Sequence, residues 1–470
     1  MPSLKNNLFY SILLVLANYV FPFLTYPYVS RVLGVTGIGA CNFVDSVINY
    51  FILFSSLGIG SLGVREIARN KGDKHALDRT FSNLLLVNLA LTGFMLVLLV
   101  AAALVVPQLS EHKDLMFIGA FKLVFNCLLV EWLFRGLEDF RFITIRTVAI
   151  KVLYVIAVFV FVRHREDVWI YYSLSSLTVV INALVNIVFS RTRVRLTFKN
   201  LELKSTFKSM LALGVYSILT SMYTTFNVTF LGFVSGETEV GYYYTATKVY
   251  YIVMAVFSAF TSVMLPRMSS LVSEGEMEKF KRYFALAVDL LLALSLPLVI
   301  WMVIMAPDIV FAVSGPEFGG SVIPMVIISP LLFVVGYEQI LVLQTLLPLG
   351  KDKIMLRNSL IGAIVGVALN IILVPFFASI GSSVVWVSVE CLILVLSQVA
   401  VTKTVSIRFP LRSTLTSVLI YLPLACLVAL CLILPGGPFV RLAASVIVVS
   451  AYVCVYQLVV KKGELIKSLI

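Results

Sequence analysis

Three basic residues and one acidic residue interrupt apolar stretches of the sequence and could carry chemistry there. Lys122 and Lys248 each stand about eight residues inside an apolar run, which corresponds to about 12 Å along a helix. Arg31 stands near the end of such a run, where its long side chain could extend outward to water or turn inward. Cations in these positions could bind an anion, and the carboxylate of Asp45 could bind a proton or a sodium ion.

Polar residues at helical spacing extend from these charged positions along one side of each predicted helix. Asn42, Asp45 and Asn49 follow a spacing of i, i+3 and i+7, and Lys122 and Asn126 follow a spacing of i and i+4. A charge deep in a bilayer costs about 2.5–3.5 kcal/mol, so these stripes should face protein or water. We assign three more residues to the same polar lining: Asn18, Tyr244 and Tyr251. Further acids expected inside the membrane are Asp289, Glu338 and Glu390.

The composition indicates that these residues lie in a membrane protein. Hydrophobic residues make up 60% of the 470 residues and charged residues only 13%, whereas soluble domains contain roughly a quarter charged residues. A chain of this length could not bury so much apolar surface in water. We therefore predict an all-α integral membrane protein with about fourteen transmembrane helices. Their expected ranges are 8–30, 38–62, 81–106, 114–134, 143–162, 168–190, 207–233, 240–265, 283–306, 320–348, 354–378, 381–402, 411–434 and 438–460.

The basic residues indicate how these helices are oriented. Alternate loops and the ends of the spans beside them hold 29 of the 36 basic residues, whereas the opposite loops are short and acidic. By the positive-inside rule, both termini are predicted to be cytoplasmic. The same distribution accounts for the formal charge of +12, so we expect no nucleic-acid partner.

An internal repeat at an offset of 202 residues aligns Gly34 with Gly236. Both copies begin on the same side of the membrane, which is typical of parallel repeats. The repeat predicts two parallel six-helix lobes around a central cleft, formed by an N-terminal lobe over 1–205 and a C-terminal lobe over 206–405. Two additional helices and a cytoplasmic tail follow over 406–470.

Two partners remain open for Asp45. The repeat places it at nearly the same depth as Lys248, so the two charges could face each other across the cleft. Alternatively, Asp45 and Lys122 form a structural ion pair inside one lobe.

Patterns of catalytic and cofactor-binding residues are missing. The segment GIGSLG at 58–63 fits the pattern GxGxxG, but it ends a predicted membrane helix instead of following a strand. The three histidines all fall in predicted loops, and no Ser/His/Asp or Cys/His constellation is present. We therefore expect no enzymatic activity, no catalytic residues, no metal and no cofactor.

Three segments resemble the polysaccharide-biosynthesis (Wzx-type) oligosaccharide flippases: YPYVSRVLGVTGIGACNFVDSV at 26–47, GIGSLGVREIAR at 58–69 and WLFRGLEDFRFITIRT at 132–147. This family shares a superfamily and a MATE-like fold with multidrug and toxin extrusion antiporters and lipid II flippases. The resemblance implies transport of a polyprenyl-pyrophosphate-linked oligosaccharide, such as an O-antigen, capsule or exopolysaccharide repeat unit. The lipid would move from the inner to the outer leaflet of the bacterial inner membrane by alternating access.

The resemblance also implies roles for the residues above. Arg31, Lys122 and Lys248 would form a cationic cleft for the pyrophosphate, and Asp45 would be the candidate for coupling to a proton or sodium gradient. The protein would contact membrane lipids and work as a monomer.

Two other functions share parts of the pattern. A drug/cation antiporter of the same fold should have an acidic or apolar cleft, whereas the deep residues here include cations. A membrane glycan polymerase commonly needs a sizeable outer loop, and the longest outer loop expected here, 307–319, has about 13 residues.

Overall fold

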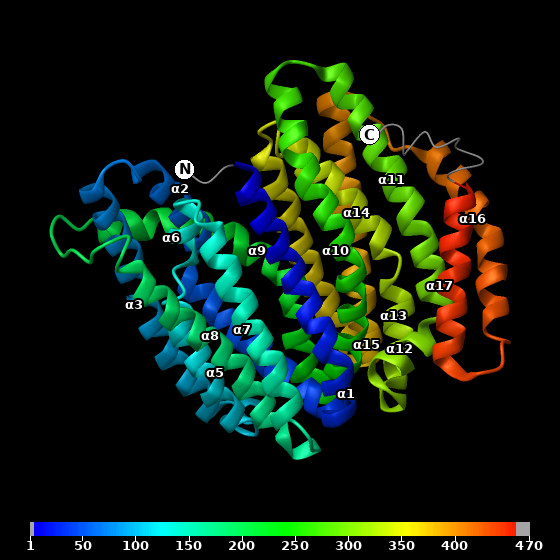
Figure 1. Cartoon of the computed structure of the whole chain (residues 1–470), viewed down its shortest axis with the longest axis horizontal. Coiled ribbons are helices and arrows are strands. Elements are labelled where there is room, and N and C mark those ends of the chain that lie inside the picture. Colours follow the sequence, from blue (N-terminus) through cyan, green and yellow to red (C-terminus); the bar gives the residue numbers. More distant parts are fainter. Residues whose placement is uncertain (1–3, 457–470) are drawn as a thin grey trace. The chain divides into compact units, whose positions relative to one another are not determined.

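The computed structural model describes residues 4–456, and every regular element over this range is a helix (Figure 1). The chain divides into two compact units, Met1–Val240 and Gly241–Ile470. Each of the fourteen expected ranges falls on one or more helices, apart from the few residues of the last range beyond 456, which lie outside the described residues. The prediction of an all-α membrane fold is therefore confirmed.

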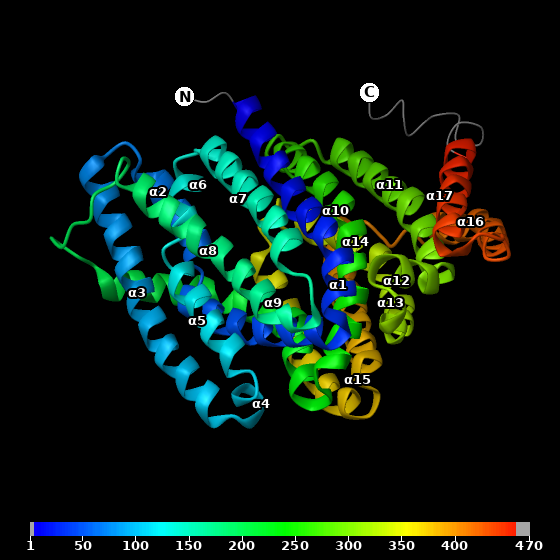
Figure 2. The ribbon, with the colours of Figure 1, turned by 60° about the horizontal axis from the view of Figure 1, so that its bottom comes forward.

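The first unit contains nine complete α-helices and the start of a tenth within its described residues. The nine are α1 (Leu4–Ser56), α2 (Ile59–Asn70), α3 (Lys74–Val105), α4 (Pro107–Ser110), α5 (Lys113–Asn126), α6 (Glu131–Gly136), α7 (Phe140–Phe161), α8 (Val168–Ser190) and α9 (Leu203–Ser235). Figure 2 shows the long helix α1, which packs against α3, α5, α7 and α9. A short 3-10 turn, η1 (Arg165–Asp167), precedes α8.

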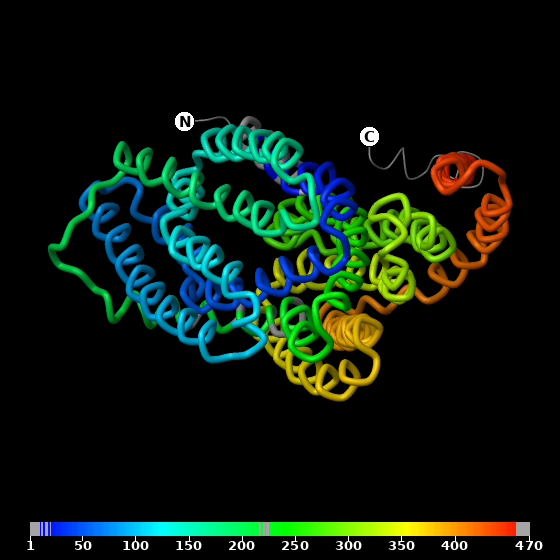
Figure 3. The backbone as a smooth tube through the Cα atoms, turned by 90° about the horizontal axis from the view of Figure 1, so that it is seen from below, coloured from blue at the N-terminus to red at the C-terminus, as the bar shows by residue number. Residues whose placement is uncertain are grey.

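The second unit is built on α10 (Glu237–Ser273), whose first residues belong to the first unit. It continues with α11 (Met277–Ile304), α12 (Ala306–Ser314), α13 (Val322–Ile328), α14 (Leu331–Leu341), α15 (Asp352–Val405), α16 (Leu411–Cys431) and α17 (Gly437–Val455). Short non-α turns are η2 (Pro316–Ser321) and η3 (Val342–Leu346). In Figure 3, α16 and α17 form a hairpin, and each of these two helices packs against α11.

The number of membrane crossings is compatible with the expected fourteen. Ten helices in the described part of the chain are long and apolar enough to cross a membrane, or eleven if the bent pair of segments over 316–346 forms one span. Two of the ten contain two expected spans each, because α1 is broken at Gly34 and α15 at Ala378. The helix α9 covers another expected range over 33 residues.

The two glycines that the predicted repeat aligns, Gly34 and Gly236, adopt nearly the same backbone conformation. Gly34 breaks α1 at φ 71° and ψ 178°, and Gly236 separates α9 from α10 at φ 83° and ψ 180°. This combination of angles is accessible almost only to glycine. The aligned glycines therefore make equivalent breaks between the first two helices of each predicted lobe.

Two local expectations can be compared with the structure. The prediction of a loop over 307–319 is wrong in part, because the helix α12 (Ala306–Ser314) occupies much of this range. A proline in the first turn and Asp308 near the N-terminus of α12 both favour the start of a helix here. The segment GIGSLG serves helix packing. Gly58 adopts φ 73° at the start of α2, and a Cβ atom on Gly63 would lie 2.7 Å from the ring of Trp132.

Candidate functional site

Asp45 lies at the centre of a polar cluster formed by three helices of the first unit. Lys122 of α5 donates a hydrogen bond from Nζ to Asp45 Oδ1. Asn49 of α1 donates from Nδ2 to Asp45 Oδ2 at 3.1 Å, and Tyr172 of α8 donates from its hydroxyl to Oδ1 at 3.4 Å. The side chains of Asp45 and Lys122 are 29% and 16% exposed. The structure thus forms the ion pair within one lobe that the sequence left open as an alternative.

Close approach between α1 and α5 makes this cluster possible. Gly119 of α5 faces Ile48 of α1, and a Cβ atom at Gly119 would lie 2.6 Å from the Ile48 side chain and 3.1 Å from the hydroxyl of Tyr172. Any larger residue would push the helices apart. Gly119 therefore positions Lys122, one turn further along α5, against Asp45.

The other two members of the predicted stripes in this unit make different contacts. Asn42 donates from Nδ2 to the carbonyl of Ile38 on its own helix at 2.7 Å. Asn126 donates to the hydroxyl of Ser56 at 3.5 Å. Both side chains are half-buried. They continue the polar line along α1 and α5, but these hydrogen bonds do not join them to Asp45.

Asn18 and Arg31 lie on exposed parts of α1. Asn18 accepts a hydrogen bond from Lys151 Nζ at 2.7 Å, and Arg31 donates from Nη1 to the carbonyl of Pro27 at 3.1 Å. Both residues are exposed to the surroundings of the chain. Neither is brought to the Asp45 cluster by these bonds, so their assignment to the polar lining stays a prediction.

The second unit places Lys248 among aromatic side chains of α10. Its Nζ donates to the hydroxyl of Tyr244 at 3.3 Å and lies 5.4 Å from the centre of that ring. Tyr251, one turn further along, is 44% exposed. The helical spacing predicted from the sequence therefore brings Lys248 and Tyr244 together.

Trp386 of α15, which the sequence reasoning did not single out, connects this aromatic group to two acids. Its ring centre lies 5.7 Å from that of Tyr251, and its indole N–H donates to Glu390 at 3.0 Å. Glu390 lies close to Glu338 of α14, so two carboxyl groups are neighbours in this unit. Only the tertiary contact between α14 and α15 could have revealed this pair.

Asp45 and Lys248 belong to different compact units. The expectation that they face each other across a central cleft therefore stays a prediction. Each unit contains a half-buried lysine of the predicted cationic cleft, Lys122 in the first and Lys248 in the second, inside an apolar helix and next to polar partners.

A family model described as polysaccharide biosynthesis protein matches residues 4–272, more than half of the chain. The chain belongs to this family. The family resemblance found in the three sequence segments is thereby confirmed, and the matched range includes Asp45, Lys122 and Lys248.

Two curated relatives cover most of this chain, and a third covers less than half of it. The "Putative O-antigen transporter" of Escherichia coli is 25% identical over 396 residues, which are 83% of this chain and 95% of the relative. A protein of the same name from Shigella dysenteriae is 26% identical over 399 residues, 83% of this chain and 98% of the relative. A Haloferax volcanii protein, named as a "Probable low-salt glycan biosynthesis flippase", is 23% identical over 210 residues, 43% of each chain.

Solved structures share the fold of this polysaccharide biosynthesis protein. The inward closed conformation of the lipid II flippase MurJ has a TM-score of 0.76 at 12% identity, covering 96% of this chain and 99% of that one. An inward-facing multidrug resistance transporter of the MATE family has a TM-score of 0.65 at 17% identity, covering 82% and 94%. These likenesses extend over nearly the whole chain and confirm the predicted MATE-like fold.

Proposed function

We propose that this protein is a flippase that moves a polyprenyl-pyrophosphate-linked oligosaccharide from the inner to the outer leaflet of the bacterial inner membrane. The observation that carries the proposal is the family match over residues 4–272. It is supported by relatives named for O-antigen transport and for glycan flipping. The fold, shared with the lipid II flippase MurJ over 96% of the chain, supports a role in transport.

The charged residues suit the chemistry of this substrate. A pyrophosphate needs cations when it leaves water, and Lys122 and Lys248 are half-buried cations inside apolar helices. Arg31, exposed on α1, is a third candidate contact. Tyr244 and Tyr251 offer aromatic surfaces on which sugar rings can pack.

A pyrophosphate at Lys122 would compete with Asp45 for the lysine. In the structure Lys122 is bound to Asp45, so binding of the substrate would leave this carboxylate with Asn49 and Tyr172. A carboxylate without a counter-charge in a poorly solvated place takes up a proton or a cation. We propose that Asp45 couples transport to a proton or sodium gradient in this way.

The carboxyl pair of the second unit is a second candidate for coupling. Glu338 and Glu390 lie close together in this unit, and two neighbouring carboxyl groups are a suitable place for a proton or a cation. Neutralising Asp45 and neutralising Glu390, one at a time, would show which of the two abolishes the dependence of transport on an ion gradient.

The organisation proposed for the transporter follows from the predicted repeat. Alternating access would occur between an N-terminal lobe over 1–205 and a C-terminal lobe over 206–405, with 406–470 as an addition. Both termini would lie in the cytoplasm, and the protein would act as a monomer. Alternating access, this orientation and the monomeric state are parts of the proposal.

The main rival is a drug/cation antiporter with the same fold. Likeness to the MATE transporters agrees with either function, because at 17% identity it speaks for the fold alone. The residues favour an anionic substrate, since each unit holds a half-buried lysine. A cationic drug would be repelled by these charges unless they stayed paired.

Glycan export tests the proposal directly. The gene would be expressed in a panel of bacterial strains whose own oligosaccharide flippase is deleted and which each make a different lipid-linked repeat unit. We expect Lys248→Ala and Lys122→Ala to lower surface glycan by at least about tenfold, the effect of one lost charge-assisted hydrogen bond. Lys281→Ala is the control, because Lys281 is 44% exposed and paired with Glu278.

Two results would contradict the proposal. Full export by both Lys248→Ala and Lys122→Ala, at normal levels of membrane insertion, would remove the cationic site. Drug resistance without glycan export by the wild-type protein would assign the chain to the antiporters.

A further inference from the structure

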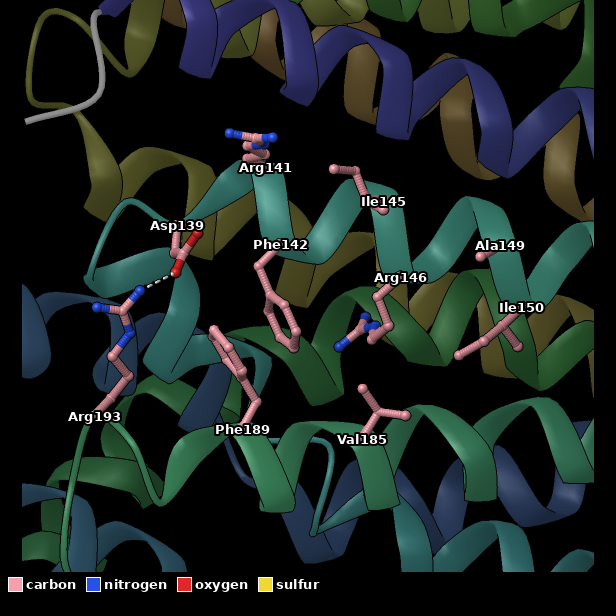
Figure 4. A pocket seen from close by; sticks show the side chains of 10 residues that line it. All are labelled: Asp139, Arg141, Phe142, Ile145, Arg146, Ala149, Ile150, Val185, Phe189 and Arg193. Carbon is pink, nitrogen blue, oxygen red and sulfur yellow. Dashed lines mark hydrogen bonds and ion pairs between the residues drawn. The ribbon is translucent and has the colours of Figure 1, made fainter.

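A pocket of about 460 Å³ opens between α7 and α8 of the first unit (Figure 4). Arg141, Ile145 and Ala149 follow one line of α7 at four-residue spacing, and Val185 and Phe189 follow a line of α8. The volume lies within the range of about 300–1,000 Å³ that is typical of small-molecule sites. The pocket is separate from the Asp45 cluster, because none of its lining residues bonds to that cluster.

One end of the pocket is charged. Figure 4 shows Arg193 beside Asp139 at this end, where the two are bound at 2.9 Å, and Arg141 on the opposite side of the first turn of α7. The guanidinium of Arg193 also lies 5.6 Å from the ring centre of Phe189. Arg141 is exposed and, among the described residues, forms no hydrogen bond or ion pair. An anion at this end would therefore meet one arginine without a partner and a second arginine held by one carboxylate.

The other end of the pocket is apolar. Figure 4 shows Ala149 and Ile150 at the far end from Arg193. Ile145 is 53% exposed and lies within a membrane span, where its exposed surface can contact lipid. From Arg141 to Ile150 the helix rises by about 13 Å. The pocket thus changes from charged to apolar along a direction that leads from the end of the span toward the middle of the bilayer.

Arg146 stands between the two ends with its charge compensated. Its side chain is 4% exposed and pairs with Glu131 at 2.8 Å, and it also donates to Asn186. Its Nε has no hydrogen-bond partner in the described part of the chain. Three arginines and one aspartate line the pocket. Arg146 shares Glu131 with Arg135, and Arg193 is paired with Asp139, so Arg141 is the lining arginine without a carboxylate partner among the described residues.

We propose that this pocket binds one anionic phospholipid, with its phosphate diester at Arg141 and Arg193 and an acyl chain along Ile145 and Ala149. The charged end lies where α7 begins and α8 has ended, on the side that the basic loops predict to be cytoplasmic. Phospholipid headgroups lie at this level of a bilayer. A phosphate diester carries one negative charge, which matches the single uncompensated arginine. The site is independent of the transported substrate and holds if the proposed function fails.

The lipid would stabilise a break in the neighbouring helices. The chain leaves helical geometry between α5 (Lys113–Asn126) and α6 (Glu131–Gly136), where Val130 has φ 38°. Asn186, which accepts from Arg146, donates to the carbonyl of Leu129 in this break. The floor of the pocket and the break therefore share one hydrogen-bond network. A bound lipid that restrains Arg146 should raise the thermal stability of the protein.

Lipid titration of the full-length protein in detergent tests the site. Native mass spectrometry would count bound phosphatidylglycerol, with zwitterionic phosphatidylcholine and free glycerol phosphate as comparison probes. We expect one tight phosphatidylglycerol per chain and a raised melting temperature. Arg141→Gln should weaken its binding about fivefold, and Ala149→Phe should do the same by filling the apolar end from an exposed position.

Two matched controls separate the site from general attraction between the protein and lipid. Arg282→Gln removes another exposed arginine near the start of a span, and Ala429→Phe enlarges another exposed alanine inside one. If Arg282→Gln weakens phosphatidylglycerol binding as much as Arg141→Gln does, or Ala429→Phe as much as Ala149→Phe does, the proposal is overturned. Equal binding of phosphatidylcholine or of glycerol phosphate would overturn it as well. Binding of a polyprenyl phosphate in place of phosphatidylglycerol would assign the pocket to the transported lipid and also overturn it.

Discussion

The Asp45–Lys122 pair allows a quantitative test of how charges are held inside this membrane protein. Exposed ion pairs contribute about 0–1 kcal/mol, whereas breaking a fully buried pair costs about 3–5 kcal/mol. With side chains 29% and 16% exposed, this pair lies between the two limits. We expect Asp45→Asn to lower the free energy of unfolding by about 2 kcal/mol, because it leaves Lys122 charged and without its carboxylate.

A double-mutant cycle separates the pair from its surroundings. Lys122→Met keeps the length of the side chain and removes its charge, which leaves Asp45 with Asn49 and Tyr172. The double variant Asp45→Asn/Lys122→Met removes both charges together. We expect it to lose less stability than the sum of the two single variants, with a coupling of about 1–2 kcal/mol.

Unfolding in mixed detergent, followed by the fluorescence of the four tryptophans, measures each free energy. The control cycle uses Lys281 and Glu278, which form a pair at 2.9 Å with side chains 44% and 88% exposed. Its coupling should be below about 1 kcal/mol. Strict additivity for Asp45 and Lys122 would refute the conclusion that they form a stabilising pair.

Two further predictions concern the backbone and pH. Gly236→Ala should lower the free energy of unfolding by about 1–3 kcal/mol, because a Cβ atom there meets nothing within 4 Å and only the backbone strain at φ 83° remains. The control is Gly93→Ala inside α3, where a Cβ atom also meets nothing within 4 Å, and this variant should be neutral or stabilising. Equal effects of the two substitutions would contradict the explanation that the backbone at Gly236 is strained for other residues. His112 contacts Glu237 at 2.5 Å, and this hydrogen bond raises the pKa of the imidazole above its usual 6.5. The stabilisation by the His112–Glu237 pair should be complete below pH 6.5 and should be lost as the pH rises through the raised pKa of His112. If the melting temperature of His112→Asn depends on pH in the same way as that of the wild type, the pair does not cause this dependence.

The apolar runs were sufficient to predict the fold class. A helix in a bilayer must satisfy its own backbone hydrogen bonds and bury about 20 apolar residues, and both requirements can be recognised in one segment of sequence. The repeat was visible for a similar reason. The break at Gly34 and Gly236 needs a residue without a Cβ atom, so glycine marks the place in both copies.

The candidate site was predictable only within single helices. Spacing of i+4 joined Asn49 to Asp45 and Tyr244 to Lys248, because side chains four residues apart lie on one face of a helix. The extent of α12 was missed, because its apolar residues lie beside a proline that is compatible with either a loop or a helix start.

Sequence by itself therefore determined that this protein is a helical membrane protein of the polysaccharide biosynthesis family, and it predicted several charges inside apolar helices. Tertiary structure alone decided which partner each charge takes. Asp45 could have met either Lys122 or Lys248, and the close approach of α5 at Gly119 selects Lys122. Pairing between helices depends on how their surfaces pack, and periodicity along one helix carries no information about its neighbour.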